Sequence, residues 1–169
     1  MSHVMPEPRS PREPRPADDA QDDRWCMAVR LLGRVEKELD RALQHEHGLP
    51  LSEYRALCAL SRTDGGSALR MGELADRIGL KDSTVTRLVG RLEDRGLVAR
   101  SSGAGDGRTV TTGITPAGAR RYAAATPTYR AALGDALEGA RANVYLRDLA
   151  AWVLTGESAV RDGDAPSPT

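Results

Sequence analysis

The sequence contains no phenylalanine, and aromatic residues make up only 4% of its 169 positions. A hydrophobic core must therefore be built from leucine, valine and alanine, which suits packed helices. The two cysteines, Cys26 and Cys58, are too few for the disulfide framework of a small secreted domain. Lysine and arginine together number 24, as do aspartate and glutamate, so the formal net charge is zero. This balance excludes a polycation that binds nucleic acid by bulk charge, but it allows a local basic face.

Long apolar runs and the sequence signatures of enzymes are also missing. No run approaches the roughly 18 apolar residues of a membrane-spanning helix, and residues 1–23 lack the apolar stretch of a secretory signal. We therefore expect a soluble, cytoplasmic protein with no membrane partner. The sequence has no glycine-rich phosphate loop, no Gly-x-Ser-x-Gly elbow and no carboxylate pair placed for acid–base chemistry. We accordingly expect neither an enzyme nor a cofactor.

Both ends of the chain are poor in bulky apolar residues. Proline and charged residues dominate residues 1–20, and the segment from Gly156 onward has the same character. Such segments cannot bury enough apolar surface to offset the entropy lost on ordering. The sequence therefore predicts disordered tails over residues 1–20 and 156–169, on either side of a single domain of residues 21–155.

The first part of that domain has helical periodicity. Apolar residues recur at three- and four-residue steps from Trp25 to Leu43. This spacing predicts one long amphipathic helix over about residues 21–48. Ser52 follows shortly afterwards and is the expected N-cap of a second helix.

Two short amphipathic segments come next. MGELADRIGL carries a glycine, Gly79, near its end, and KDSTVTRLVGRLEDRGLV carries Gly96 where a helix C-terminus prefers glycine. Two helices joined by a short turn that contains glycine form a helix-turn-helix. The sequence therefore predicts this DNA-binding motif.

The predicted helix-turn-helix is followed by a hairpin and a further helical region. Residues 97–115 carry short apolar segments around a Gly/Ser loop, which predicts a β-hairpin placed as a wing. Thr115 and Pro116 then pair an N-cap residue with proline at the first helical position. Helical periodicity continues to the end of the domain, with a break expected near residues 126–128 or 139–143. The expected fold class is mainly α with a small β-hairpin wing.

Charge is distributed unevenly along the chain. From Arg70 to Arg121 there are ten basic and six acidic residues, a net charge of +4, whereas residues 1–23 contain three arginines and six acids, a net charge of −3. Phosphate contacts need such a basic segment, because counterion release supplies much of the affinity for DNA. The expected partner is therefore double-stranded DNA.

The second helix of the motif carries hydroxyl and cationic side chains away from its apolar positions. Short hydroxyls allow a close approach to phosphates, and arginine can reach O6 and N7 of guanine in the major groove. The expected DNA-contacting residues here are Lys81, Ser83, Thr84, Thr86, Arg87 and Arg91. The alternative, a merely solvated polar face, is disfavoured by the adjoining helix and wing. In the wing, Arg108 is expected to enter the minor groove, and Asp106 to hold an arginine in position by an ion pair.

These motifs resemble those of the multiple-antibiotic-resistance regulator (MarR) family over about residues 24–155. Lys81–Val89 is similar to the recognition helix of the family, typically Ser-x-Ser-Thr-Val-Ser-Arg-Leu-Val. Family wings typically carry Asp-x-Arg, five residues, then Leu or Ile and Thr. Asp106, Arg108 and the pair Ile114-Thr115 match this spacing.

The resemblance implies a homodimeric winged helix-turn-helix regulator. Dimerisation helices of about residues 21–48 and 116–155 would flank a winged helix-turn-helix of about residues 51–115. Such a dimer binds a pseudo-palindromic operator with half-sites about 10 bp apart. The resemblance further implies a repressor that is released from DNA by a small-molecule effector, often aromatic or anionic, bound between the dimer helices and the winged domain.

One position of the recognition helix departs from the family pattern. Where many relatives carry arginine, this chain has Asp82. Asp82 can cap the helix by accepting backbone N–H bonds, or it can accept a hydrogen bond from N4 of cytosine. The cap is favoured, because an unpaired carboxylate near phosphates is costly.

Cys26 supports an alternative function, a thiol-based redox-sensing repressor. The resemblance extends to an organic-hydroperoxide-sensing branch of the family, which keeps its peroxidatic cysteine near this point. Tyrosines that assist the cysteine in that branch are replaced here by Arg30 and Asp40. Arg30 could stabilise a thiolate, but Asp40 cannot replace a phenol. Cys58 is expected to belong to the core.

Two further alternatives concern the histidines and the winged domain as a whole. His45 and His47 stand at alternate positions of a helix and face apart, so no metal site is expected, although they could line the effector cleft. A winged helix can also serve as a protein-interaction module. The arginines of the recognition helix and wing disfavour that hypothesis.

Overall fold

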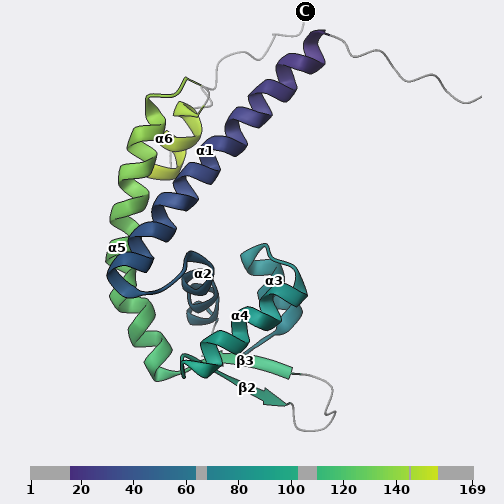
Figure 1. Cartoon of the computed structure of the whole chain (residues 1–169), viewed down its shortest axis with the longest axis vertical. Helices are drawn as coiled ribbons and strands as arrows, with labels where there is room; N and C mark the ends of the chain where they lie inside the picture. The colour runs from purple at the N-terminus through teal and green to yellow at the C-terminus, as the bar shows by residue number, and fades with distance from the viewer. Residues whose placement is uncertain (1–15, 64–67, 103–109, 145, 156–169) are drawn as a thin grey trace, which may run out of the picture.

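The computed structural model describes residues 16–63, 68–102, 110–144 and 146–155. Its helices are α1 (Pro16–His47), α2 (Leu51–Ser61), α3 (Met71–Ile78), α4 (Asp82–Asp94), α5 (Pro116–Arg141) and α6 (Arg147–Thr155), and its strands are β1 (Leu69–Arg70), β2 (Val98–Ser102) and β3 (Val110–Ile114). Helices α1, α5 and α6 form an elongated limb, below which α2, α3, α4 and the sheet form a smaller lobe (Figure 1). The predicted fold class, mainly α with a small β-hairpin wing, is confirmed.

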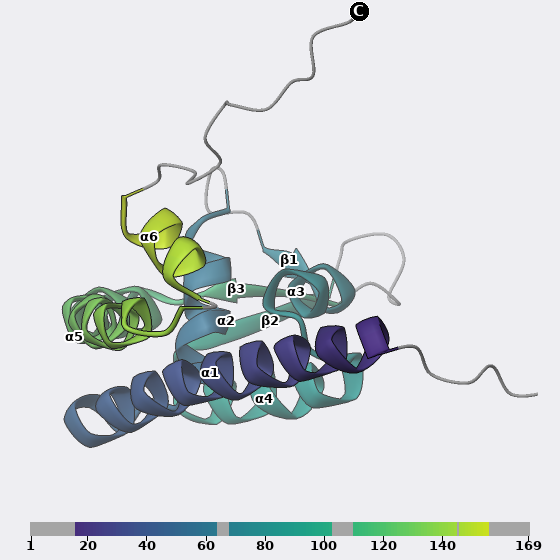
Figure 2. The same ribbon diagram turned by 90° about the horizontal axis from the view of Figure 1, so that it is seen from above.

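From above, α5 is seen end-on at one side of the molecule, and α1 extends from it towards the side on which α3 and α4 lie (Figure 2). The helix-turn-helix therefore lies below α1 and to one side of α5 (Figures 1 and 2).

The sheet has three antiparallel strands in the order β1-β3-β2. In the predicted hairpin, Val98 is paired with Ile114 and Ser102 with Val110. The two-residue strand β1 was not predicted, because it is too short to show an alternating pattern. Residues 103–109, which include Asp106 and Arg108, lie outside the described residues.

One helix boundary differs from the sequence prediction, and one choice between two predicted breaks is settled. Helix α1 begins at Pro16, so residues 16–20 are helical rather than part of a tail, and proline suits the first turn of a helix. Helix α5 continues through Pro127 and ends at Arg141, so the break falls in the second of the two predicted ranges, 139–143. Tyr122 and Tyr129, on either side of Pro127, pack against the core and anchor both parts of the helix.

The start of α2 is capped by a residue from another helix. Its N-cap position is Pro50, and Ser52 lies inside the helix, so the predicted Ser52 cap is wrong. The backbone N–H of Leu51 donates to Oδ1 of Asp40 at 2.8 Å. This carboxylate on α1 satisfies an amide that α2 itself leaves without a partner.

The core is divided between the lobe and the limb. The larger cluster joins the second half of α1 to α2–α5 and β2, and a smaller one forms where Leu31 meets α5 and α6. In contrast, Trp25 is 68% exposed and Leu32 49%, although both belong to the apolar series that predicted α1. The first half of α1 therefore has an apolar face that the described residues of the chain leave largely uncovered.

The first turn of α5 lies very close to the start of β2. Thr115 caps α5 as predicted, because its Oγ1 accepts from the N–H of Gly118 at 3.0 Å. The same hydroxyl donates to the carbonyl oxygen of Gly96 at 2.7 Å. A Cβ at position 118 would lie 2.0 Å from the carbonyl oxygen of Leu97, so only glycine fits without movement of the backbone.

Gly118→Ala is expected to lower the free energy of unfolding by about 1–3 kcal/mol, because the opposing atom is a backbone oxygen. Gly134→Ala is the matched control, since a Cβ at position 134 of α5 would meet nothing within 4 Å. The control should be neutral or stabilising, because alanine favours a helix. Chemical denaturation measures both variants, and equal effects would contradict the close approach.

Candidate nucleic-acid interface

Helices α3 and α4 form the predicted helix-turn-helix. Gly79 ends α3 in the left-handed conformation, with φ of 68°, and Lys81 is the N-cap of α4. The inward side of α4 is fully buried and is made of four aliphatic residues, Val85, Leu88, Val89 and Leu92. Because these residues fix the rotation of α4, they also fix which side chains face outward.

The outward side of α4 brings together most of the predicted DNA-contacting residues. Lys81, Ser83, Thr86 and Arg87 are exposed, and Thr84 is half-buried. The hydroxyl of Thr86 donates to the carbonyl oxygen of Asp82 at 2.9 Å, so its lone pairs stay available to a donor. Among the described residues, the structure records no ion pair for Arg87. This surface can therefore offer both hydroxyls and a cation to DNA.

Asp82 does not make the expected cap bond. It is the first residue of α4, after the N-cap Lys81, and no side-chain hydrogen bond caps this helix. Its carboxylate still stands in the first turn, where the helix dipole favours negative charge. The sequence prediction therefore placed the N-cap of α4 at Asp82, one residue after its actual position at Lys81.

Arg91 on α4 and Arg95, the C-cap residue directly after α4, share one buried carboxylate. Nε of Arg91 donates to Oε1 of Glu53 at 3.4 Å, and Nη1 of Arg95 donates to Oε2 at 2.5 Å. Glu53 lies on α2, and its side chain is only 4% exposed. Sequence reasoning missed this residue, although it stands four positions before the buried Leu57 on the apolar side of α2.

Another arginine ties the wing to the same helix. Arg100 on β2 lies 3.5 Å from Oε2 of Glu93, measured from its Nε. Its Nη2 donates to the carbonyl oxygen of Thr86 at 3.2 Å. These contacts fix β2 against α4. The expected roles of Asp106 and Arg108 stay predictions, because both lie outside the described residues.

A cavity of about 460 Å³ lies where α2, α3 and α5 meet. Its lining is aromatic and basic: Tyr54, Arg55, Cys58, Ala59, Arg62, Arg77, Ile78 and Tyr129. Tyr54 stacks on Tyr129 with a ring-centroid distance of 4.5 Å, and its hydroxyl donates to Oγ1 of Thr126 at 3.3 Å. Burial raises the pKa of Tyr54 from 10.0 to about 12. The cavity combines a flat aromatic wall with three guanidinium groups.

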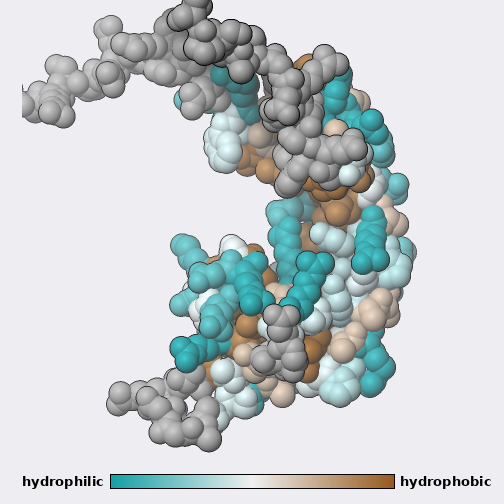
Figure 3. Space-filling view, turned by 180° about the vertical axis from the view of Figure 1, so that it is seen from behind, coloured by the Kyte–Doolittle hydropathy of each residue, from teal (hydrophilic) through white to brown (hydrophobic). Residues whose placement is uncertain are grey.

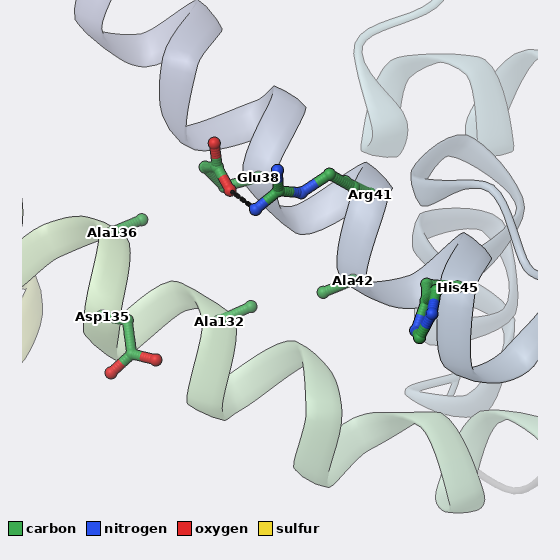
Figure 4. Close-up of a pocket in the computed structure, with 7 residues that line it drawn as sticks. All are labelled: Glu38, Arg41, Ala42, His45, Ala132, Asp135 and Ala136. Atoms are coloured by element: carbon green, nitrogen blue, oxygen red, sulfur yellow. Dashed lines mark ion pairs between the residues drawn. The ribbon is translucent and has the colours of Figure 1, made fainter.

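A larger cavity of about 630 Å³ lies between α1 and α5 (Figure 4). Alanines form much of its lining, with Glu38 and Arg41 paired at 2.9 Å on its α1 side. His45 lines this cavity, whereas Nε2 of His47 lies 2.8 Å from Oγ1 of Thr128 on α5. No group of His, Cys, Asp or Glu among the described residues could hold a metal ion.

The two cysteines occupy different surroundings. Cys26 is exposed on α1, and the redox-sensing hypothesis for it stays a prediction. Cys58 is half-buried and lines the α2–α3–α5 cavity, with the hydroxyl of Tyr122 donating to its Sγ at 3.4 Å.

Within the described part of the chain, none of the helices is long and apolar enough to cross a membrane.

The chain resembles proteins of a known family in sequence. The family model of the MarR family matches residues 47–109. Over 102 residues the chain is 26% identical to the HTH-type transcriptional repressor MdtR of Bacillus subtilis (strain 168). This match covers 60% of the chain and 63% of the relative, so the chain spans less than two thirds of that relative's length.

Solved structures resemble it over more of the chain. Sco3205, a MarR family transcriptional regulator from Streptomyces coelicolor in complex with DNA, has a TM-score of 0.66 at 25% identity, over 92% of this chain and 98% of that chain. CouR from Rhodococcus jostii RHA1, bound to p-coumaroyl-CoA, has a TM-score of 0.59 at 26% identity, over 76% of this chain and 89% of that chain. The sequence motifs and the winged helix-turn-helix of this chain are therefore similar to those of MarR family regulators, in sequence over residues 47–109 and in fold over most of the chain.

Proposed function

We propose that the chain is a dimeric, sequence-specific DNA-binding transcriptional regulator of the cytoplasm, without enzymatic activity. It represses transcription until a small molecule releases it from its operator. The observation that carries this proposal is the outward side of α4, where hydroxyl and cationic residues are held beside a β2–β3 hairpin by a fully buried aliphatic face. The DNA-bound structure of Sco3205 supports this function.

In the proposed complex, α4 enters the major groove. Ser83, Thr84, Thr86, Arg87 and Arg91 face the base edges, and Lys81 contacts the DNA at the N-terminus of the helix. Arg108 enters the minor groove from the wing, where the electrostatic potential of A·T-rich DNA attracts arginine.

Arg87→Ala is expected to cost about 1–3 kcal/mol of binding free energy and to relax specificity at one base position per half-site. Fluorescence anisotropy with duplexes substituted at each position measures both effects. Arg141→Ala, which removes a cation paired with Glu138 at the far end of α5, is the control and should leave binding unchanged. An equal loss on every duplex would mean that Arg87 contacts only phosphate.

The proposed dimer uses the apolar face that the limb leaves uncovered. Trp25, Val29 and Leu32 are exposed on α1, and Val153 and Leu154 are exposed on α6. Figure 3 shows hydrophobic side chains gathered in the upper part of this limb, whereas hydrophilic ones predominate along its outer edge and on the lobe of α3 and α4. Exposed apolar side chains gathered on one part of a surface are typical of a protein–protein interface.

Leu32→Asp is expected to weaken the dimer about 100-fold. Each leucine contributes about 1.5 kcal/mol or more on burial, and a twofold interface contains the residue twice. Sedimentation equilibrium measures the dissociation constant. Lys37→Asp, at an exposed polar position of the same helix, is the matched control and should stay dimeric. A Leu32 variant as dimeric as the control would refute this interface.

The proposed effector site is the α2–α3–α5 cavity. Tyr54 and Tyr129 supply a surface on which a planar ring can stack, and Arg55, Arg62 and Arg77 supply positive charge. Arg55 is already paired with Glu36 at 2.7 Å, which leaves Arg62 and Arg77 as the principal anion contacts. CouR, bound to p-coumaroyl-CoA, supports an aromatic, anionic effector for this chain.

Benzoate, as a planar anionic probe, is expected to raise the melting temperature and to weaken DNA binding. Benzyl alcohol has the same ring without the charge and should do neither, because only a carboxylate can pair with the arginines. Arg77→Gln should abolish the response to benzoate without preventing DNA binding. Equal responses to both probes would contradict the proposed role of the arginines.

A further inference from the structure

Glu53 is the only charged residue that is buried among the residues described. It belongs to α2, and in the recorded hydrogen bonds its carboxylate contacts only two side chains, those of Arg91 on α4 and of Arg95, the C-cap residue of α4. Removing a carboxylate from water is costly unless opposite charge and hydrogen bonds compensate it. The pair of arginines supplies this compensation, so the three side chains act as one unit.

The two arginines are used in different ways. One terminal nitrogen of Arg95, Nη1, donates a hydrogen bond to Glu53. The other, Nη2, donates to the carbonyl oxygen of Gly48 at 3.2 Å. Both ends of its guanidinium are therefore occupied, and it ties the end of α4 to the turn between α1 and α2. Arg95 is a structural contact rather than a free cation.

Arg91 is held by only one side of its guanidinium. The recorded bond to Glu53 uses Nε–H, and the side chain is 57% exposed. The two terminal nitrogens keep their four N–H donors for another acceptor. A guanidinium fixed at Nε presents these donors as a flat, oriented fork, the geometry that binds guanine or phosphate in two places at once.

We propose that Glu53 is a positioning residue for DNA recognition, which holds Arg91 by its Nε–H so that the terminal nitrogens are directed at DNA. This inference rests on the proposed DNA-binding function. A long side chain that is already fixed loses less conformational entropy when it binds. Glu53 therefore increases the preference for the operator over other DNA without touching DNA itself.

Glu53→Gln tests this role, because it keeps the size of the side chain and removes its charge. Binding of the full chain is measured against an operator duplex, obtained by selection from random DNA, and against a scrambled duplex of the same length. We expect affinity for the operator to fall about tenfold, while affinity for the scrambled duplex does not fall. A variant that merely unfolds would lose both. Glu138→Gln removes the same charge far from α4 and should leave both affinities unchanged.

A double-mutant cycle with Arg91 separates positioning from packing. In an Arg91→Ala background, Glu53→Gln should cost less than twofold in operator affinity, because there is no guanidinium left to orient. Arg91→Lys keeps the charge but has no fork, and it leaves Glu53 paired with Arg95. Arg91→Lys should therefore lose the preference for the operator over the scrambled duplex, and it tests the inference even if Glu53→Gln does not fold.

Two outcomes would overturn the inference and leave Glu53 as a packing contact. One is that the losses of operator affinity in the double-mutant cycle are additive. The other is that both Glu53→Gln and Arg91→Lys keep the wild-type preference for the operator over the scrambled duplex. Failure of the proposed function has a different signature. In that case the wild-type chain itself would show no preference for any selected duplex.

Discussion

The candidate interface depends on the burial of one face of α4. Val85, Leu88, Val89 and Leu92 are all fully buried, and each contributes about 1.5–3 kcal/mol on leaving water. A helix has only one rotation that satisfies these four positions at once. The same burial therefore directs the polar face outward, where it can contact a partner. The chemistry of the surface is thus set by the aliphatic core beneath it.

Helix α2 is the element shared by the two candidate sites. Glu53 contacts Arg91 and Arg95 at the end of α4, and its neighbour Tyr54 forms part of the wall of the α2–α3–α5 cavity. Asp40 on α1 fixes the beginning of the same helix by accepting the N–H of Leu51. A ligand that moved α2 would therefore move the carboxylate that holds Arg91. Packed helices transmit such shifts because their cores are not continuously deformable.

Local patterns in the sequence predicted the local structure well. The helix-turn-helix, the hairpin and the Thr115 cap all depend on neighbouring residues, and all three are present. Features that depend on distant residues were missed. The start of α2 is capped by Asp40 of another helix and not by Ser52. Glu53 pairs with Arg91, and periodicity within one helix cannot predict a contact between residues that far apart in the sequence. Periodicity also identified the apolar face at Trp25, but it could not show that the described part of the chain leaves this face exposed.

Selection from a random duplex library by the full chain, followed by sequencing, tests the central claim most directly. Two winged domains related by twofold symmetry should enrich a pseudo-palindrome whose half-sites are about 10 bp apart. The enrichment should persist in the presence of excess nonspecific DNA, because base contacts add to the contacts with phosphate. A library that shows no enriched motif, or only a general preference that disappears with added salt, would contradict a sequence-specific regulator.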